Sequence, residues 1–185
     1  MPINSKKKIR GTYYPPGDKS ISHRSLILTS QAIGKSEITN LLEGEDVIST
    51  LLVMRELGAR IKKKNGKYIV YGLPPGALFQ PKKQLDFGNS GTGIRLLAGL
   101  ISSNNIKATL KGDRSLSKRP MGRVTDHLKK IGAEIQLKKK SFPPISIKGV
   151  GDAIPLNYDI KIPSAQIKSA IMLSALNTNG LVKIK

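Results

Sequence analysis

One pattern recurs along the chain at nearly constant intervals. A run of small residues leads to a serine and then to an apolar stretch, and these serines, Ser20, Ser90 and Ser164, lie 70 and 74 residues apart. A second marker repeats with it, because Leu57–Ile61 and Ile131–Ile135 are also 74 residues apart. Repeats of this length predict structural units that each bury an apolar face against a neighbour. We expect three such units, near residues 16–75, 76–150 and 151–185.

The first unit shows which elements each repeat should contain. Ser20 stands where an N-cap or first-turn hydroxyl belongs, and the apolar helix after it should stop at Gly34. A strand is followed by a helix from Asp46 to Gly58 with apolar residues at helical spacing, and then by a hairpin around Asn65–Gly66. The predicted strands cover residues 36–42, 60–64 and 67–71. Helices and strands in this order predict a mixed α/β (α+β) fold.

The third unit stops early. The chain ends in Gly180–Lys185, which is typical of a strand, and no second helix or hairpin follows in the sequence. By the period of the first two units, about 50 further residues would complete it. We therefore expect a truncated third unit, in a sequence that is a fragment or a truncated gene product.

The net charge of +20 suggests a polyanionic partner, with nucleic acid as the first candidate. Lysine outnumbers arginine 24 to 8, however, and many lysines form short runs such as Lys62–Lys64 and Lys138–Lys140 beside predicted strands. Solvated lysines at strand edges keep sheets from pairing with other chains. Aromatic residues make up only 4% of the chain and Trp is absent, so base-stacking platforms are scarce. We expect no nucleic-acid partner.

Other classes of protein are excluded by simple observations. The chain has no cysteine, which rules out disulfides, thiolate metal sites and a cysteine nucleophile. No apolar stretch is long enough to span a bilayer, and the charged start of the chain lacks the apolar run of a secretory signal. These observations predict a cytoplasmic protein without a membrane segment.

The turn Gly17–Ser20 resembles a nucleotide-binding phosphate loop but does not match its pattern. The spacing of the glycines is one residue too long, and two prolines remove backbone donors that would have to hold phosphate. What remains is Lys19 and Ser20 at a predicted helix start, with Arg24 one turn later on the same face. A helix N-terminus offers free N–H groups and positive potential to an anion. Taken alone, these residues are better explained as a capped helix with solvated cations.

The other two units add similar residues at their own helix starts. Asn89–Gly93 has two glycines that let an anion approach the backbone, and Arg95 follows them. Arg114–Arg123 places four cations in ten residues around Pro120, which we predict to begin a helix ending at Gly132. The third unit offers Ser164, Gln166 and Lys168. Three such helix starts on one face would be unusual without an anion between them.

Together these segments resemble the successive motifs of the 5-enolpyruvylshikimate-3-phosphate synthase family, whose members are enolpyruvyl transferases. The motifs occur in the family's order and spacing and extend over nearly the whole chain. Shorter matches accompany them at Leu42–Asp46 and Leu57–Ala59. The matching motifs are Pro16–Arg24, Gly88–Arg95, Lys118–Gly122 and Ser164–Gln166.

The resemblance implies a fold of two similar domains, each with three βαβαββ units around a pseudo-threefold axis, and an active site in the cleft between them. Residues 16–185 would form one incomplete domain, and a strand within residues 1–15, near Lys8–Tyr14, would belong to the other domain. The implied reaction transfers the enolpyruvyl group of phosphoenolpyruvate to the 5-hydroxyl of shikimate 3-phosphate and releases phosphate. It serves chorismate and aromatic amino acid biosynthesis and is a target of glyphosate. No cofactor or metal is implied, and the complete enzyme would be a monomer.

The resemblance also implies a role for each matched residue. For shikimate 3-phosphate the implied ligands are Lys19, Ser20, Arg24, Ser164 and Gln166. For phosphoenolpyruvate they are Lys19, Gly91, Arg119 and Gln166. The family's Asp and Glu acid/base groups fall outside this sequence, so no catalytic group is identified in it and we expect no turnover by the fragment alone. Leu96 and Ala165 depart from the commonest family pattern and match a subset of its members.

Three alternatives remain open. The first is an enolpyruvyl transferase acting on UDP-N-acetylglucosamine, which shares the fold and the chemistry. Such enzymes usually have Asn after the lysine of the first motif, where this chain has Ser20 after Lys19. They also usually carry a reactive cysteine, whereas this chain has no cysteine. A nucleic-acid-binding or RNA-end-processing protein would bind random oligonucleotides with a steep salt dependence. The third alternative is a non-catalytic remnant.

Overall fold

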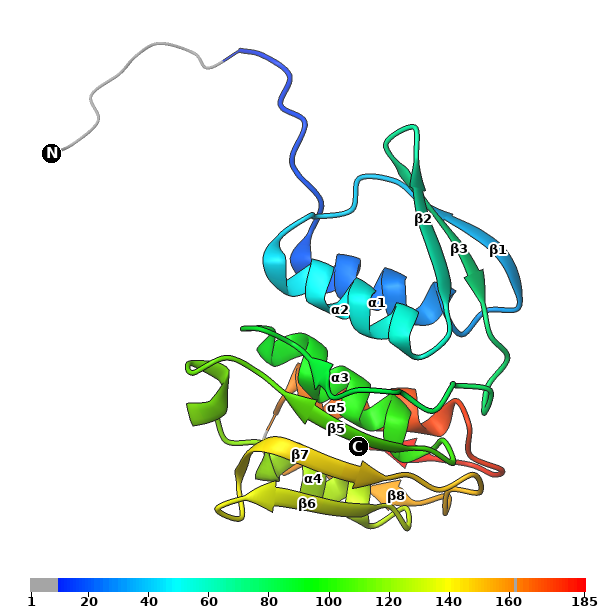
Figure 1. Ribbon diagram of the computed structural model, residues 1–185, viewed down its shortest axis with the longest axis vertical. Helices are drawn as coiled ribbons and strands as arrows, with labels where there is room; N and C mark the ends of the chain where they lie inside the picture. Colours follow the sequence, from blue (N-terminus) through cyan, green and yellow to red (C-terminus); the bar gives the residue numbers. More distant parts are fainter. Residues whose placement is uncertain (1–9, 162) are drawn as a thin grey trace, which may run out of the picture.

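The computed structural model describes residues 10–161 and 163–185. Two parts can be distinguished, an upper part formed by the first predicted unit and a lower part formed by the other two (Figure 1). The strand predicted near Lys8–Tyr14 is not formed by residues 10–14, and residues 8 and 9 lie outside the described part of the chain. A strand requires a hydrogen-bonded neighbour, and no strand of the described residues pairs with this segment.

The first unit contains two helices and a three-stranded antiparallel sheet in the order β1-β3-β2. Its elements are α1 (Lys19–Thr29), β1 (Gly34–Ile38), α2 (Glu45–Glu56), β2 (Arg60–Lys64) and β3 (Lys67–Gly72). The predicted hairpin is confirmed, because Asn65 and Gly66 both have positive φ, at 49° and 73°, as a two-residue type I′ turn requires. The second helix ends before Gly58, as predicted, and Gly58 also has positive φ.

Two boundaries of the first unit differ from the prediction. The first helix ends at Thr29 and not near Gly34, because the carbonyl of Ser30 accepts a hydrogen bond from Leu73 N at 2.9 Å and the chain turns to meet β3. The following strand is β1, residues 34–38, and not 36–42. It ends early because Asn40 adopts a left-handed conformation with φ 53°, which no strand accommodates.

The second unit repeats the sheet of the first. Its elements are β4 (Leu85–Asp86), α3 (Gly91–Ser102), β5 (Lys107–Lys111), the 3-10 turn η1 (Leu116–Lys118), α4 (Gly122–Lys129), β6 (Glu134–Lys138) and β7 (Phe142–Lys148). The sheet order is β4-β5-β7-β6, with β4 parallel to β5 and the other pairs antiparallel. The order β5-β7-β6 matches β1-β3-β2 of the first unit, so the repetition predicted from the sequence is present in the strand topology.

The third unit contains β8 (Asn157–Tyr158), α5 (Ala165–Ala175) and β9 (Lys183–Ile184). The strands β8 and β9 are parallel, as β4 and β5 are. In the second unit, Pro120 does not begin α4 as predicted, because that helix starts at Gly122 and Met121 occupies its N-cap. Pro120 instead places its carbonyl where Arg95 donates a hydrogen bond to it at 3.1 Å.

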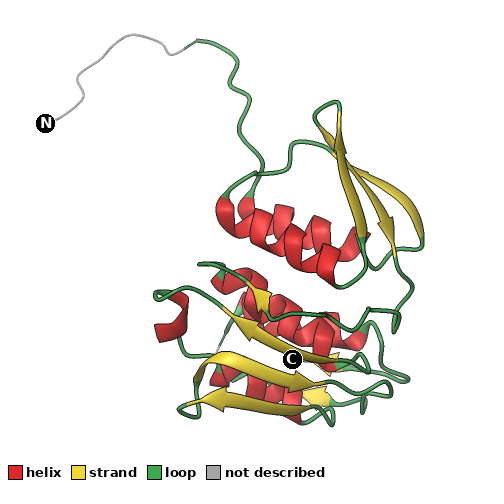
Figure 2. Ribbon diagram, viewed as in Figure 1, coloured by secondary structure: helices red, strands yellow, loops and turns green. Residues whose placement is uncertain are grey.

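The helix α3 forms the centre of the fold. Ten of its twelve residues are buried, and it contacts α1, α2, α4 and α5. Figure 2 shows helices alongside the sheet in both parts of the molecule. Leu96, one of the departures from the family pattern, is fully buried in this core, where an apolar side chain without a polar atom packs well. Burial of α3 therefore fixes how the three units pack.

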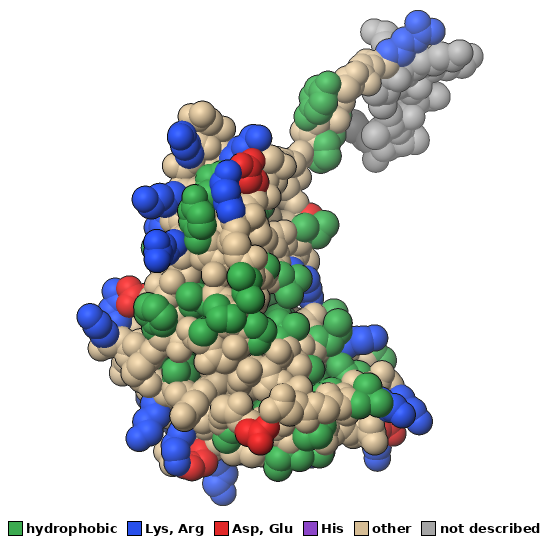
Figure 3. Space-filling model, turned by 90° about the vertical axis from the view of Figure 1, so that its right-hand side faces the viewer, with side chains coloured by type: hydrophobic (Ala, Val, Ile, Leu, Met, Phe, Trp, Pro, Cys, Tyr) green, Lys and Arg blue, Asp and Glu red, His purple; other side chains and the backbone are tan. Residues whose placement is uncertain are grey.

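Most of the excess lysines lie on solvent-exposed faces. Lysines of the strands pair with nearby carboxylates, for example Lys63 with Glu43 at 2.5 Å and Lys148 with Glu134 at 2.5 Å. Figure 3 shows Lys and Arg side chains scattered around the rim of one face, with Asp and Glu among them, around a more apolar middle. Among the described helices none is long and apolar enough to cross a membrane.

The contact between α3 and α5 yields a prediction about stability. A β-carbon on Gly99 would lie 2.1 Å from the carbonyl oxygen of Ala170, so Gly99→Ala must push the helices apart. We expect it to lower the free energy of unfolding by about 1–3 kcal/mol, the usual cost of overpacking. Gly122→Ala is the matched control, since its nearest neighbour would be Ser141 Oγ at an ordinary 3.5 Å. Urea denaturation of both variants tests this, and equal stabilities would contradict it.

Candidate functional site: three converging helix starts

Each of α1, α3 and α5 begins with a capped first turn. Asp18 Oδ1 accepts a hydrogen bond from Ile21 N at 2.7 Å. Ser90 Oγ accepts from Gly93 N at 3.1 Å, and Ser164 Oγ accepts from Ile167 N at 3.3 Å. The residue equivalent to Ser90 and Ser164 is therefore Asp18, while Ser20 lies in the first turn. Ser20 is the second residue of its helix, the position held by Thr92 in α3 and Gln166 in α5.

The three helix starts lie at the same end of the molecule. Gln166 Nε2 donates to Thr92 Oγ1 at 3.2 Å, which joins the first turns of α5 and α3. Arg24 Nη2 donates to Ser169 Oγ at 2.7 Å, which joins the second turns of α1 and α5. Free backbone N–H groups and the helix dipoles give each start a positive potential. Hydrogen bonds thus join the first two turns of the three helices.

Two arginines flank the start of α3. Arg95 donates to Gly91 O at 3.0 Å and to Pro120 O at 3.1 Å. Arg119 donates to Asn89 Oδ1 at 2.5 Å. Burial, together with the charge of Arg119, lowers the pKa of Arg95 below its ordinary value. Two like charges near one helix start, held by neutral acceptors, leave positive charge available to a ligand.

Gly91 lies directly beneath these two guanidinium groups. A β-carbon there would lie 2.9 Å from Arg119 Nη1 and 3.1 Å from Arg95 Nη1. The glycine is needed because the arginine side chains occupy the space of a side chain at residue 91. The sequence analysis named Gly91 and Arg119 as ligands but assigned no role to Arg95, whose hydrogen bonds link Gly91 to Pro120, the residue after Arg119.

Lys19 is held by a carboxylate that sequence reasoning did not select. Its ammonium forms an ion pair with Asp46 Oδ2, at the start of α2. The Lys19 side chain is 57% exposed and that of Asp46 only 18%. Burial opposes ionisation of Asp46, but the hydrogen bond and charge of Lys19 outweigh it, so the pKa of Asp46 is lowered. The only sequence signal for Asp46 was its place in the motif Leu42–Asp46.

The helix α2 also joins the starts of α1 and α3. Thr50 Oγ1 lies 2.8 Å from His23 Nδ1, and a β-carbon on Gly93 would lie 2.5 Å from the same oxygen. Ser22 Oγ accepts from Leu42 N at 3.0 Å, which ties α1 to the loop before α2. The motif residues therefore form one connected group.

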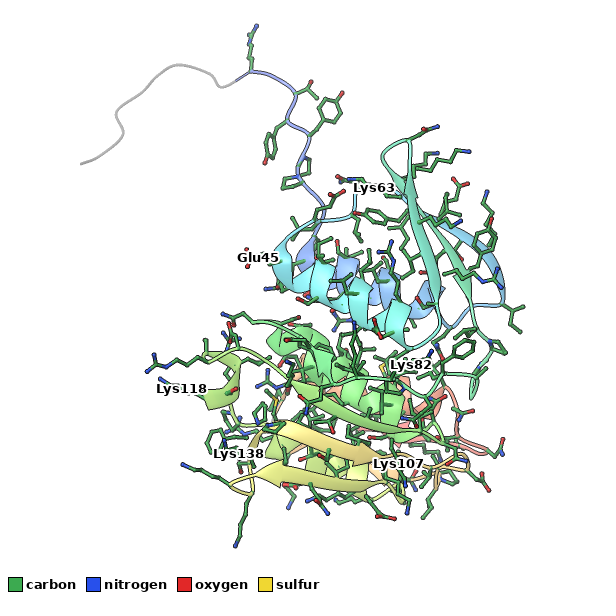
Figure 4. The ribbon with its side chains drawn as sticks, in the orientation of Figure 1. Glu45, Lys63, Lys82, Lys107, Lys118 and Lys138 are labelled. Atoms are coloured by element: carbon green, nitrogen blue, oxygen red, sulfur yellow. The ribbon has the colours of Figure 1, made fainter. Side chains whose placement is uncertain are left out.

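The cations of Arg114–Arg123 are only partly brought together. Three of them line one open hollow of about 580 Å³ beside η1, and the fourth, Arg123, lines a different hollow with His127. The three in the first hollow are Arg114, Lys118 and Arg119. Figure 4 shows Glu45 of α2 and Lys118 at one side of the molecule, while Lys82 and Lys107 lie at the other. Within residues 10–161 and 163–185 no three His, Asp or Glu side chains gather as a possible metal site.

The fold, with its three capped helix starts, is shared with proteins of one family. Residues 3–185 match the profile of the family described as EPSP synthase (3-phosphoshikimate 1-carboxyvinyltransferase). The 3-phosphoshikimate 1-carboxyvinyltransferase of Novosphingobium aromaticivorans is 48% identical over 177 residues, which are 95% of this chain and 40% of that protein. The protein of that name from Zymomonas mobilis is 46% identical over 186 aligned positions, which cover 99% of this chain and 41% of that protein.

A solved structure agrees with these relatives. EPSP synthase from Acinetobacter baumannii has a TM-score of 0.90 and 41% identity, over 95% of this chain and 40% of that one. The chain therefore belongs to the EPSP synthase family. It spans about 40% of the length of the relatives that it matches.

The Lys19–Asp46 ion pair predicts an acid-dependent stability. The pKa of Asp46 is lowered from 3.8, so the ion pair stabilises the fold above that value and is lost as the pH falls toward the lowered pKa. We expect the parent chain to be more stable than Asp46→Asn at neutral pH, and the difference to be smaller at a pH below 3.8. Urea denaturation at both pH values measures it. A difference that stays constant would show that the charge of Asp46 does not contribute.

Proposed function

We propose that this chain supplies the anion-binding half of an enolpyruvyl transferase site. The reaction would transfer the enolpyruvyl group of phosphoenolpyruvate to the 5-hydroxyl of shikimate 3-phosphate and release phosphate, in the biosynthesis of chorismate and the aromatic amino acids. Membership of the EPSP synthase family and the names of its relatives support this reaction. The proposal includes a cytoplasmic location and a monomeric complete enzyme, as the sequence suggested.

The observation that carries the proposal is that hydrogen bonds join the first two turns of α1, α3 and α5, which have cations beside them. Arg24 reaches Ser169 and Gln166 reaches Thr92, so ligands held by any two of these helices would be neighbours. Two phosphates and two carboxylates must lie close together in this reaction, and their mutual repulsion requires several fixed cations and N–H donors. The cations and the free N–H groups beside these helix starts would supply both.

The residues divide between the two substrates. We assign Lys19, Ser20 and Arg24 of α1, with Ser164 and Gln166 of α5, to shikimate 3-phosphate. We assign Gly91 and Arg119 to phosphoenolpyruvate, where Gly91 lets the guanidinium of Arg119 lie against the start of α3. Lys19 and Gln166 would contact both. No residue of this chain receives an acid/base role.

The rival functions have less support. The relatives reported above carry the name of the shikimate enzyme, and Lys19–Ser20 fits that assignment better than a site for UDP-N-acetylglucosamine. A nucleic-acid partner would favour a continuous basic surface, whereas many lysines of the strands are paired with carboxylates.

Ligand binding by this chain tests the proposal. We expect shikimate 3-phosphate to bind more tightly than shikimate, because the phosphate engages the helix starts. Lys19→Ala and Arg24→Ala should each weaken binding of shikimate 3-phosphate by about 1.5–3 kcal/mol, the value of one charge-assisted contact. Isothermal titration calorimetry measures the affinities.

Lys107→Ala is the matched control, because it removes one exposed positive charge at the opposite side of the molecule (Figure 4). Its affinity should equal that of the parent chain. Equal losses in Lys19→Ala and Lys107→Ala would indicate unspecific attraction and would contradict the assigned site.

Gly91→Ala should act through Arg119 and not by filling the site. The added methyl would displace the ends of the Arg119 and Arg95 side chains, which lie 2.9 and 3.1 Å from it. We expect weaker binding of phosphoenolpyruvate, by roughly 1 kcal/mol or more as for a lost charged contact, and little change for shikimate 3-phosphate. In the double variant with Arg119→Ala the substitution should have a smaller effect. Full additivity of the two losses would show that Gly91 acts independently of Arg119.

A further inference from the structure

His23 is a buried side chain whose polar group lacks a partner. It lies in α1 with none of its surface exposed, and its Nε2 makes no hydrogen bond to any residue that the structure describes. Its other nitrogen, Nδ1, lies 2.8 Å from Thr50 Oγ1. A buried polar atom without a partner destabilises the fold, so its presence requires an explanation.

The unpartnered nitrogen faces the carboxylate that holds Lys19. The distance from His23 Nε2 to Asp46 Oδ2 is 3.8 Å. This distance is too long for a hydrogen bond, but it exceeds the upper end of the usual donor–acceptor range by less than about 1 Å. The same oxygen, Oδ2, forms the ion pair with Lys19. Asp46 Oδ1 is meanwhile fixed by Val47 N at 2.9 Å. Asp46 Oδ2 therefore lies between the exposed ammonium of Lys19 and the buried Nε2 of His23.

The surroundings favour a neutral ring with its proton on Nε2. The Thr50 hydroxyl has one proton and two acceptors within reach, His23 Nδ1 at 2.8 Å and the backbone carbonyl of Asp46 at 3.4 Å. If it donates to the closer acceptor, Nδ1, the ring proton lies on Nε2 and points toward the Asp46 carboxylate, whereas the other tautomer would turn a lone pair toward it. Burial lowers the pKa of His23 and outweighs the raising effect of Asp46, while the charges of Lys19 and Arg24 lower it further. A neutral donor is thus in place before any ligand arrives.

We propose that His23 is a positioning residue that takes over the Asp46 carboxylate when Lys19 turns to an anionic ligand. This rests on the proposed function only for the identity of the ligand. Lys19 cannot serve a phosphate fully while its ammonium is paired, and its departure would leave a carboxylate without a partner beside an anion. A hydrogen bond from His23 Nε2 holds the carboxylate back and lowers the cost of releasing Lys19. No proton is taken up, since the donor is already present.

The imidazole nitrogens can be observed directly in the whole chain, because it has only two histidines. His127 of the second unit is the internal control. Its ring packs against that of Tyr158 in the third unit, with the ring centroids 5.8 Å apart. On titration with shikimate 3-phosphate, we expect the His23 Nε2 signal to shift and its N–H to exchange with water about tenfold more slowly, the ratio for one ordinary hydrogen bond. His127 should not change.

A ligand-free arm tests the exchange separately. Lys19→Met removes the competing ammonium and should produce the same change at His23 without any ligand. The double variant Lys19→Met with Asp46→Asn should lose that change, since an amide accepts a weaker hydrogen bond than a carboxylate.

The outcomes separate the two proposals. If shikimate 3-phosphate shifts the backbone amide of Thr92 but leaves His23 unchanged, the role of His23 is wrong and the proposed function stands. If no ligand binds, the proposed function fails, and Lys19→Met alone decides about His23. An identical His23 signal in the parent chain and in Lys19→Met overturns the inference.

Discussion

The close packing of α3 against α5 determines where the groups of the site lie. Gly99 lets the helices approach until a β-carbon on it would lie 2.1 Å from the carbonyl oxygen of Ala170. At this separation the first turns are adjacent, and Gln166 reaches Thr92. Burial of ten of the twelve residues of α3 supplies the apolar stabilisation that maintains the contact. The polar site is thus fixed by an apolar contact about two helical turns away from it.

Gathering positive groups without an anion has an energetic cost, and the structure reduces it without cancelling the charge. The guanidinium groups of Arg95 and Arg119 bond to neutral acceptors, namely two backbone carbonyls and the Asn89 side chain. Carboxylates in those places would compete with an anionic ligand for the arginines. Lys19 is the exception, because it is paired with Asp46, and in the proposed exchange it leaves this carboxylate for an anion. A second hydrogen-bond donor is therefore useful beside Asp46, whose carboxylate would lose its partner if Lys19 left it. The neutral acceptors of the arginines have no charge that needs such a donor.

The sequence predicted what local chemistry determines and missed what distant contacts determine. Asn65–Gly66 specifies its hairpin by itself, because few residues adopt two successive positive φ values. Ser20 was predicted as an N-cap or first-turn hydroxyl, and the structure places it in the first turn with Asp18 as the cap, a residue that the prediction passed over. The end of α1 depends on Leu73, and the partner of Lys19 comes from α2, so neither follows from neighbouring residues. Contacts between units carry no periodic signal in a single sequence.

The net charge of +20 illustrates why composition was a weak guide to the site. Lysines of the strands, such as Lys35 beside Glu37, form exposed pairs that contribute little to stability and need no ligand. The cations beside the helix starts are few, and the arginines among them have neutral partners, whereas Lys19 is paired with Asp46. Arg24, bonded to a serine of another unit, is half-buried, whereas a solvated lysine of a strand is not. A chain of this family with a much lower net charge could therefore keep the same site, because the charge that binds anions is set by which partners surround each cation.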